Sequence, residues 1–244
     1  MRRIDADHVG SLLGIVLTGS AARGLATDQS DVDVLAILEY VDRADTPWVH
    51  SAALEVIPLT LEHIESVASF GAPEWGYRWT YAWAPILLDR TGGRIQAALE
   101  RQTRLTLQEA NAILVGHSQL DAWINLLYRA LKSARGGNGL EARLDGAESV
   151  PMLLDVVFAL HGLVRPYNKY LRWSLQNHPI PSWPADDLLG LLQRTMAGDA
   201  DAMRQTYARV HDDCMSFDRR HGQELLGHVL EGWAGESYGV LRGQ

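Results

Sequence analysis

The sequence lacks the features that mark disulfide-bonded, secreted and membrane proteins. Its one cysteine, Cys214, cannot form a disulfide within the chain, which fits a reducing compartment or indifference to one, and we expect it to be a small buried residue. Residues 1–10 contain no apolar core of a secretion signal. No uninterrupted apolar segment approaches the ~20 residues that a membrane span needs. These absences predict a cytoplasmic protein without a membrane partner.

Positive charge is also scarce in this chain. Its 244 residues include 22 lysines and arginines against 30 aspartates and glutamates, for a formal net charge of −8. Duplex binding needs clustered cations that neutralise phosphates, so this balance argues against a nucleic-acid partner. A small substrate or a partner protein fits better. With 47% hydrophobic and 21% charged residues, the composition is that of a globular protein that can bury a core.

One short stretch combines residue types and a spacing that need a chemical explanation. An apolar run with strand character, Leu12–Thr18, ends in Gly19-Ser20, and a second run, Val32–Leu38, begins beside Asp31 and Asp33. Residues i and i+2 of a strand share a face, so the two carboxylates would lie side by side. Like charges that close repel each other unless a cation lies between them. Each fragment alone could be an ordinary turn, but together they favour a functional site.

This arrangement resembles the nucleotidyltransferases of the DNA polymerase β superfamily. Their signature is an apolar strand, Gly-Ser or Gly-Gly, a spacer, and Asp-x-Asp inside a strand. The chain contains Gly-Ser-Ala-Ala-Arg-Gly at residues 19–24 and Ser-Asp-Val-Asp at residues 30–33. The likeness covers residues 12–39 and is closest to the minimal and aminoglycoside-type nucleotidyltransferases. Beyond that range only the layout is similar.

The resemblance implies a metal-dependent enzyme. Nucleotidyl transfer moves a strongly charged phosphorus centre, so catalysis is chiefly positioning and charge neutralisation by divalent ions. Mg²⁺ prefers oxygen ligands, and we expect Asp31 and Asp33 to bind two such ions. Glu55 is the candidate third carboxylate, brought across from the aspartates if its strand runs antiparallel to theirs. Glu55 would be either a third metal ligand or the general base. In related enzymes, an acid in a similar Leu-Glu-Val setting acts as the general base. The alternative is a solvent-facing strand acid.

Four residues around the motif are candidates for nucleotide binding. Gly19 permits close approach of the backbone to a phosphate, and the Ser20 hydroxyl with the following amides can form an anion-binding turn. Arg23 could bind the triphosphate or be a solvated surface arginine. Ser30 could contact the nucleotide or only cap the entry to the strand.

A fifth candidate, Lys169, lies in the second half of the chain. The segment Arg-Pro-Tyr-Asn-Lys-Tyr-Leu at residues 165–171 resembles a Pro-Tyr-x-Lys segment of some two-domain relatives, in which the lysine reaches across a cleft to the phosphates. A cation there is physically reasonable because the triphosphate charge must be balanced. The alternative is an ordinary surface lysine.

The chain changes character near residue 100. The first part contains β-type runs at residues 12–18, 32–38, 52–59 and 84–89, a loop at 39–48, and a short helix from Thr60 to near Gly71. Pro58 marks the third run as an edge or terminal strand. We therefore expect an α/β (α+β) nucleotidyltransferase domain with a mixed sheet over residues 1–100.

Helical periodicity predicts an all-α domain over residues 101–244. The resemblance to two-domain relatives implies that this domain closes over substrate and nucleotide. A capping box at Thr106 starts the first helix, which runs to Gly136. A second helix is expected after Ser149 and breaks at Pro166. A third has its apolar stripe at Met203, Tyr207, Val210, Cys214 and Phe217, and further helices are expected at 186–196 and 223–233. Four or five helices are enough for a bundle.

Three functions remain open at this point. The first is transfer of a nucleoside monophosphate, AMP in most relatives, from an Mg-nucleoside triphosphate such as ATP to a hydroxyl of a small molecule such as an aminoglycoside-like antibiotic or a lincosamide. The second is an antitoxin-like protein adenylyltransferase that modifies a partner protein. The third is a non-catalytic nucleotide-binding protein. A substantial helical domain favours the first, because the smallest antitoxin relatives lack one, and the intact Ser20, Asp31 and Asp33 argue against the third.

Overall fold

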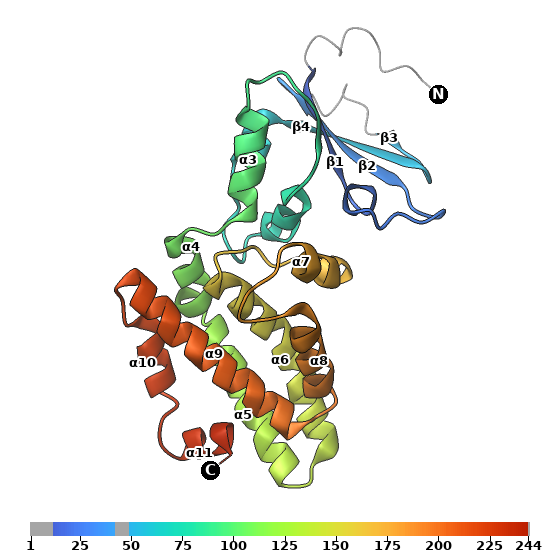
Figure 1. The fold of residues 1–244 in the computed structure, drawn as a ribbon. Coiled ribbons are helices and arrows are strands. Elements are labelled where there is room, and N and C mark those ends of the chain that lie inside the picture. Colours follow the sequence, from blue (N-terminus) through green and yellow to red (C-terminus); the bar gives the residue numbers. More distant parts are fainter. Residues whose placement is uncertain (1–11, 42–48, 244) are drawn as a thin grey trace. The chain divides into compact units, whose positions relative to one another are not determined.

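A computed structural model describes residues 12–41 and 49–243. The chain forms two compact units, Met1–Arg104 and Leu105–Gln244 (Figure 1). The division follows helix α3 (Arg94–Thr103), a few residues after the change in sequence character. The segment at residues 1–10 and most of the loop predicted at 39–48 lie outside the described residues.

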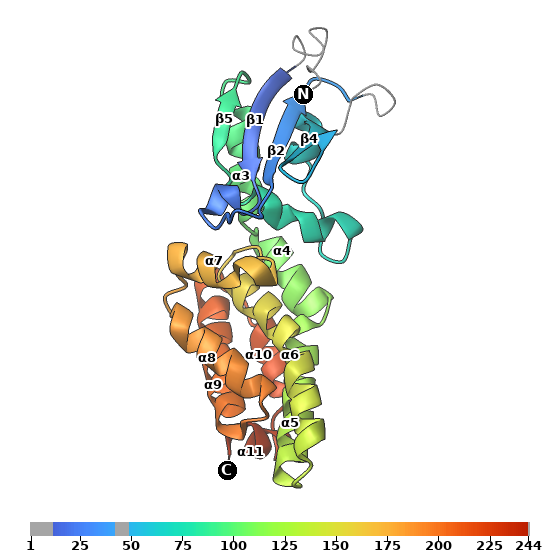
Figure 2. The same cartoon turned by 90° about the vertical axis from the view of Figure 1, so that its right-hand side faces the viewer.

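The first unit is built on a mixed five-stranded sheet with strand order β3-β4-β2-β1-β5 (Figure 2). Strand β1 pairs antiparallel with β2 and β5, β3 pairs antiparallel with β4, and β2 and β4 are parallel. The strands are β1 (Leu12–Thr18), β2 (Val32–Leu38), β3 (Val49–His50), β4 (Leu54–Thr60) and β5 (Ile86–Asp89). The prediction that Pro58 marks an edge or terminal strand was wrong for the strand as a whole, because β4 lies between β3 and β2. Among the described residues, β3 pairs only with Glu55 and Val56 of β4, so Pro58 lies beyond this pairing. The expected mixed sheet is confirmed.

The core of the first unit lies between the sheet and helices α2 (Leu61–Glu65) and α3. Alternate residues of β1 and β2 point into it because successive side chains of a strand face opposite sides. The buried residues include Val16, Leu35, Ile37, Ile64 and Ile95. A Cβ at Gly14 of β1 would overlap the side chain of Ile95, so glycine lets α3 pack directly on the sheet.

Helix α2 begins as predicted but ends earlier. The Thr60 hydroxyl accepts a hydrogen bond from the His63 amide, as an N-cap residue should. The helix ends at Glu65 instead of near Gly71, because the side chain of Gln102 donates to the carbonyls of Ile64 and Ser66 and caps this end. A 3₁₀ segment, η2 (Pro73–Tyr81), follows.

The second unit consists of helices, so the predicted all-α region is confirmed. Its longest members are α5, α6 and α9, and they pack against one another. The elements are α4 (Leu107–Asn111), the π-helical turn η3 (Ala112–Gly116), α5 (Gln119–Arg135), α6 (Gly139–Leu160), η4 (Asn168–Tyr170), α7 (Leu171–Asn177), α8 (Ala185–Met196), α9 (Ala200–His221), α10 (Leu225–Glu231) and α11 (Glu236–Arg242).

Two helix boundaries in this unit differ from the predictions. The capping box of Thr106 and Glu109 is present, but the first helix does not continue to Gly136, because Ser118 has a φ of 52° and separates η3 from α5. The second helix begins at Gly139, before the expected start, and Ser149 lies inside it with its hydroxyl bonded to the Gly146 carbonyl at 2.7 Å. This helix ends at Leu160, ahead of Pro166.

The third helix agrees with its apolar stripe. All five predicted positions of α9 are buried, and the rings of Trp123 on α5 and Tyr207 on α9 stack at 6.4 Å between centroids. Cys214 is fully buried as expected, and burial raises the pKa of its thiol well above the ordinary value. None of the helices in the described ranges is both long and apolar enough to span a membrane.

Candidate active site

Three carboxylates meet at the end of the parallel strand pair. Asp33 of β2 lies directly opposite Glu55 of β4, and Asp31 immediately precedes β2. One oxygen from each of these residues lies within 4.8 Å of the other two, and all three side chains are partly exposed. The structure therefore brings together the three predicted metal-ligand candidates.

The predicted direction of the Glu55 strand was wrong. Strand β4 runs parallel to β2, not antiparallel. The chain reverses direction twice between them, because the two-residue strand β3 pairs antiparallel with β4 just before it. The parallel register still places Glu55 beside Asp33, so the residue reaches the site by a different route from the one expected.

Strand pairing holds Asp33 from both sides. Its neighbour on β1 is Thr18, which is buried and whose hydroxyl lies 3.4 Å from the Asp33 carbonyl oxygen. Its neighbour on β4 is Glu55. A residue in the interior of a sheet has little backbone freedom, so the carboxylate is presented from a rigid support.

The turn after β1 approaches Asp33 closely. Gly19 has a φ of +64°, a conformation that favours glycine, and a Cβ at this position would overlap Oδ2 of Asp33. Ser20 follows, with its side chain buried and its carbonyl accepting hydrogen bonds from the amides of Arg23 and Leu25 at 3.1 and 3.0 Å. The glycine thus leaves space beside the carboxylates that any other residue would fill.

Arg23 and Ser30 both make contacts that support the loop itself. Nη2 of Arg23 donates to the Ala82 carbonyl at 2.7 Å, and its buried guanidinium lies 5.0 Å from the ring centroid of Trp79. Ser30 accepts a hydrogen bond from the Thr27 amide at 2.9 Å and closes the turn before β2. These contacts account for both residues structurally, and their roles in nucleotide binding remain predictions.

Sequence reasoning missed His50, which borders the site. Its Nδ1 lies 3.5 Å from Oε1 of Glu55, and the two residues are paired across β3 and β4. The side chain of His50 is 72% exposed and that of Glu55 is 22% exposed. A two-residue strand leaves no periodicity to detect, so the sequence offered no signal for this neighbour.

Lys169 belongs to the second unit. It lies in η4 with an exposed side chain, and its Nζ is 5.2 Å from the ring centroid of Tyr170. Its predicted contact with the nucleotide phosphates remains a prediction.

The three carboxylates fit a hard divalent cation. Mg²⁺ and similar ions take oxygen ligands and keep several of their waters, which suits two or three carboxylates at a partly exposed site. Three acidic groups at this separation repel one another, and a bound cation would offset that repulsion. The donor set is therefore suited to Mg²⁺.

Comparisons with known proteins agree with this description of the first unit. Residues 6–67 match the family model of the nucleotidyltransferase domain. The matched range contains β1, β2, β4 and all three carboxylates. This part of the chain is thus similar to nucleotidyltransferase domains, which supports the assignment of the protein as a transferase enzyme.

Several chains of solved structures are also similar. Among them is a nucleotidyltransferase-like protein from Exiguobacterium sibiricum, 13% identical in sequence, and the superposition has a TM-score of 0.40 and covers 86% of this chain and 72% of that chain. A search among curated proteins found no match.

Proposed function

We propose that this enzyme transfers a nucleoside monophosphate from an Mg-nucleoside triphosphate to a hydroxyl group of a small molecule. ATP is the first candidate for the donor, so AMP would be the group transferred. The observation that carries the proposal is the meeting of Asp31, Asp33 and Glu55 within 4.8 Å of one another, beside the open turn at Gly19.

The reaction requires one bond to form and one to break. The acceptor oxygen bonds to the α-phosphorus of the triphosphate, the bond from that phosphorus to the bridging oxygen breaks, and pyrophosphate leaves. The acceptor proton goes to a base. When bound, the divalent ions neutralise charge on the phosphates and orient them for in-line displacement.

Each residue of the site has a proposed role in this reaction. Asp31 and Asp33 would hold the metal ions from the start of β2. The space at Gly19 would admit a phosphate close to the backbone, and the Ser20 turn would supply hydrogen-bond donors to it. Glu55 would be the third ligand or the base, since it faces Asp33 from the neighbouring strand.

The acceptor is proposed to be a small molecule such as an aminoglycoside-like antibiotic. The helical second unit of the chain supports this choice over a partner protein, because the smallest antitoxin-like relatives lack such a unit. We also propose that Lys169 contributes a positive charge to triphosphate binding. Replacing Lys169 with Met should then raise the apparent KM for ATP more than it lowers kcat.

A transfer assay tests the proposal directly. The purified chain would be incubated with Mg²⁺, each of the four α-labelled nucleoside triphosphates, and a panel of aminoglycosides, lincosamides and other polyols. Label should move to a small-molecule product, pyrophosphate should be released in equal amount, and EDTA should abolish both. Label found only on protein would favour the partner-protein alternative, and no transfer with any acceptor would contradict the proposal.

A further inference from the structure

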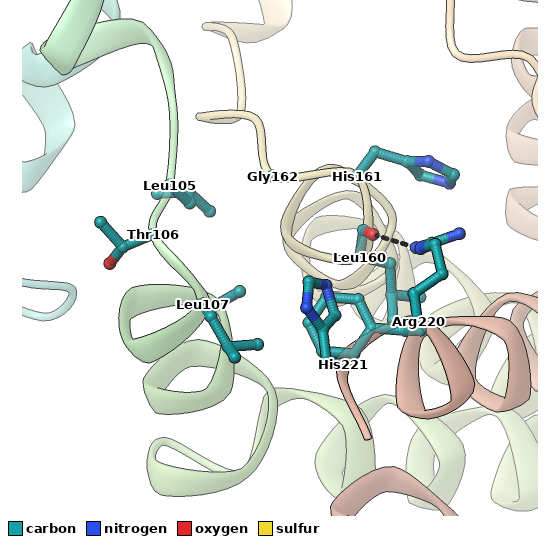
Figure 3. Close-up of a pocket in the computed structure, with 10 residues that line it drawn as sticks. Leu105, Thr106, Leu107, Leu160, His161, Gly162, Arg220 and His221 are labelled. Carbon is teal, nitrogen blue, oxygen red and sulfur yellow. Dashed lines mark hydrogen bonds between the residues drawn. The ribbon is translucent and has the colours of Figure 1, made fainter. Parts of the chain in front are cut away.

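The second unit contains a pocket of about 340 Å³ that the proposed reaction does not use. Its walls come from the start of α4, the end of α6 and the last turn of α9 (Figure 3). Leu105, Leu107 and Phe217 supply apolar surface, and the volume falls within the range of small-molecule sites. The pocket is therefore large enough for a ligand of modest size.

The residues that line the pocket differ in charge from the chain as a whole. Arg220, His161 and His221 line it, and none of the described residues that line it is acidic. The whole chain carries 30 acidic residues against 22 lysines and arginines. Figure 3 shows His161 and Arg220 together on one side, with Leu105, Thr106 and Leu107 on the other. The pocket thus has an apolar wall and a basic side.

Arg220 has no carboxylate partner among the described residues. Its Nη1 donates to the Ser216 hydroxyl and its Nη2 to the Leu160 carbonyl, both at 3.3 Å, which is long for a hydrogen bond. Other arginines of this unit form ion pairs, such as Arg129 with Asp145 at 2.8 Å and Arg194 with Asp199 at 2.7 Å. A guanidinium has five N–H donors, so Arg220 keeps most of them for a ligand.

Two backbone carbonyls beside the basic side are already hydrogen-bonded. The C-terminal carbonyls of a helix carry partial negative charge and repel anions when they are unpaired. At the end of α6, the Leu160 carbonyl accepts a hydrogen bond from Arg220, and the Gly162 carbonyl accepts one from the Leu105 amide at 2.9 Å. These hydrogen bonds offset part of the negative charge at the end of α6.

Both histidines of the pocket are held in place. Nε2 of His161 lies 3.1 Å from Oδ2 of Asp213 and 3.1 Å from the Ser182 hydroxyl. The ring of His221 packs on Phe217 with 4.6 Å between centroids. The rings therefore form fixed parts of the wall.

We propose that this pocket binds a small organic anion, with a carboxylate or phosphate monoester group held by Arg220 and an apolar part covered by Leu105, Leu107 and Phe217. The size limits the apolar part to roughly a phenyl ring or a short alkyl chain. No residue of the pocket belongs to the carboxylate site, so this proposal does not rest on the proposed nucleotidyl transfer.

Titration of the full chain, without Mg²⁺ or nucleotide, tests the proposal. Phenyl phosphate, benzoate, inorganic phosphate and benzyl alcohol would be added in turn and followed by amide NMR shifts. Phenyl phosphate or benzoate should bind saturably, with shifts concentrated at Leu105, Leu107 and Gly162, and the tighter of the two identifies the anionic group. Inorganic phosphate and benzyl alcohol should bind at least tenfold more weakly, since each lacks one half of the ligand.

Two matched pairs of variants identify the residues. Arg220→Gln should weaken binding about tenfold or more, the usual loss for a charged hydrogen bond. Arg219→Gln should have no effect, because Arg219 is exposed on the same turn of α9 but does not line the pocket. Leu107→Glu places an acid at the apolar wall and leaves Arg220 in place, and it should weaken binding by at least as much as Arg220→Gln. Leu107→Gln should weaken binding less.

Three results would overturn the proposal. The first is an absence of saturable shifts with either anion at millimolar concentration. The second is equal affinity for benzyl alcohol, which would make the pocket merely apolar. The third is an equal loss of binding in the Arg219 and Arg220 variants, which would show that only the net charge of the chain matters.

Discussion

The backbone of Gly19 lies against the carboxylate of Asp33, so closely that a Cβ at residue 19 would overlap Oδ2 of the aspartate. The position of the side chain that would hold a metal therefore depends on the absence of a side chain in the turn that would receive a phosphate. This contact joins the two halves of the motif, which are separated in sequence by the loop between β1 and β2.

Gly19→Ala should inactivate the enzyme. The new methyl group must displace the Asp33 carboxylate, and a misplacement of about 1 Å at a reacting centre can cost about 10²-fold in rate. Gly24→Ala is the matched control, because Gly24 has a similar φ of +66° and nothing within 4 Å of its added Cβ. Both variants should lose about 1 kcal/mol of stability from backbone strain. Equal turnover of the two variants would show that the Asp33 contact has no catalytic importance.

Replacing Glu55 with Gln separates a general base from a metal ligand. If Glu55 is the base, the variant should lower the rate of the chemical step by roughly 10²–10⁴-fold and remove the acid limb of the pH–rate profile. If Glu55 is a third metal ligand, the Mg²⁺ requirement should rise and the limb should stay. Glu62→Gln, at an exposed position in α2, should do neither. An unchanged rate and Mg²⁺ dependence in the Glu55 variant would remove it from the mechanism.

Asp213 should make stability depend on acid pH. Burial alone would raise the pKa of this carboxyl, but hydrogen bonds from His161, Trp183 and Ser182 outweigh burial and hold the pKa below its ordinary value. The distances to Oδ2 are 3.1, 2.7 and 3.1 Å. A lowered pKa gives stability that is present above the unfolded value near 3.9 and is lost as the pH falls through the folded value.

Asp213→Asn should therefore destabilise the protein by about 1–3 kcal/mol at neutral pH and by less in acid. Urea unfolding at pH 7 and near pH 3 measures both values. Asp212→Asn is the control, because that neighbouring side chain is 83% exposed. A loss of stability in the Asp213 variant that did not shrink in acid would show that hydrogen-bond geometry matters there and charge does not.

Local patterns in the sequence were sufficient to predict the motif and the helices that have a clear apolar stripe. Strands β1 and β2 and the pairing of Asp31 with Asp33 follow from alternation and from the turn residues between them. Helix α9 follows from its apolar spacing. These features depend on residues close together in the chain, which the sequence records directly.

The remaining errors have physical causes that lie outside such local patterns. The direction of β4 depends on β3, which is too short to show alternation. The first turns of α6 expose Leu140 and Leu144 at 59% and 61%, so no buried stripe marks its start. Ser149 and Pro151 look like a helix start, but they lie inside α6. The arginine of the pocket gave no signal, because its isolation from carboxylates appears only in the fold.

The most direct test of the central claim compares two variants, Asp33→Asn and Asp28→Asn. The measurement is the Mg²⁺-dependent transfer of label from an α-labelled nucleoside triphosphate to the acceptor. Asp28 is exposed in the loop before β2 and is not part of the carboxylate group. The account predicts wild-type turnover for Asp28→Asn and no measurable transfer for Asp33→Asn, with both variants folded. Near-normal transfer by folded Asp33→Asn would contradict the assignment of the metal site, and with it the proposed mechanism.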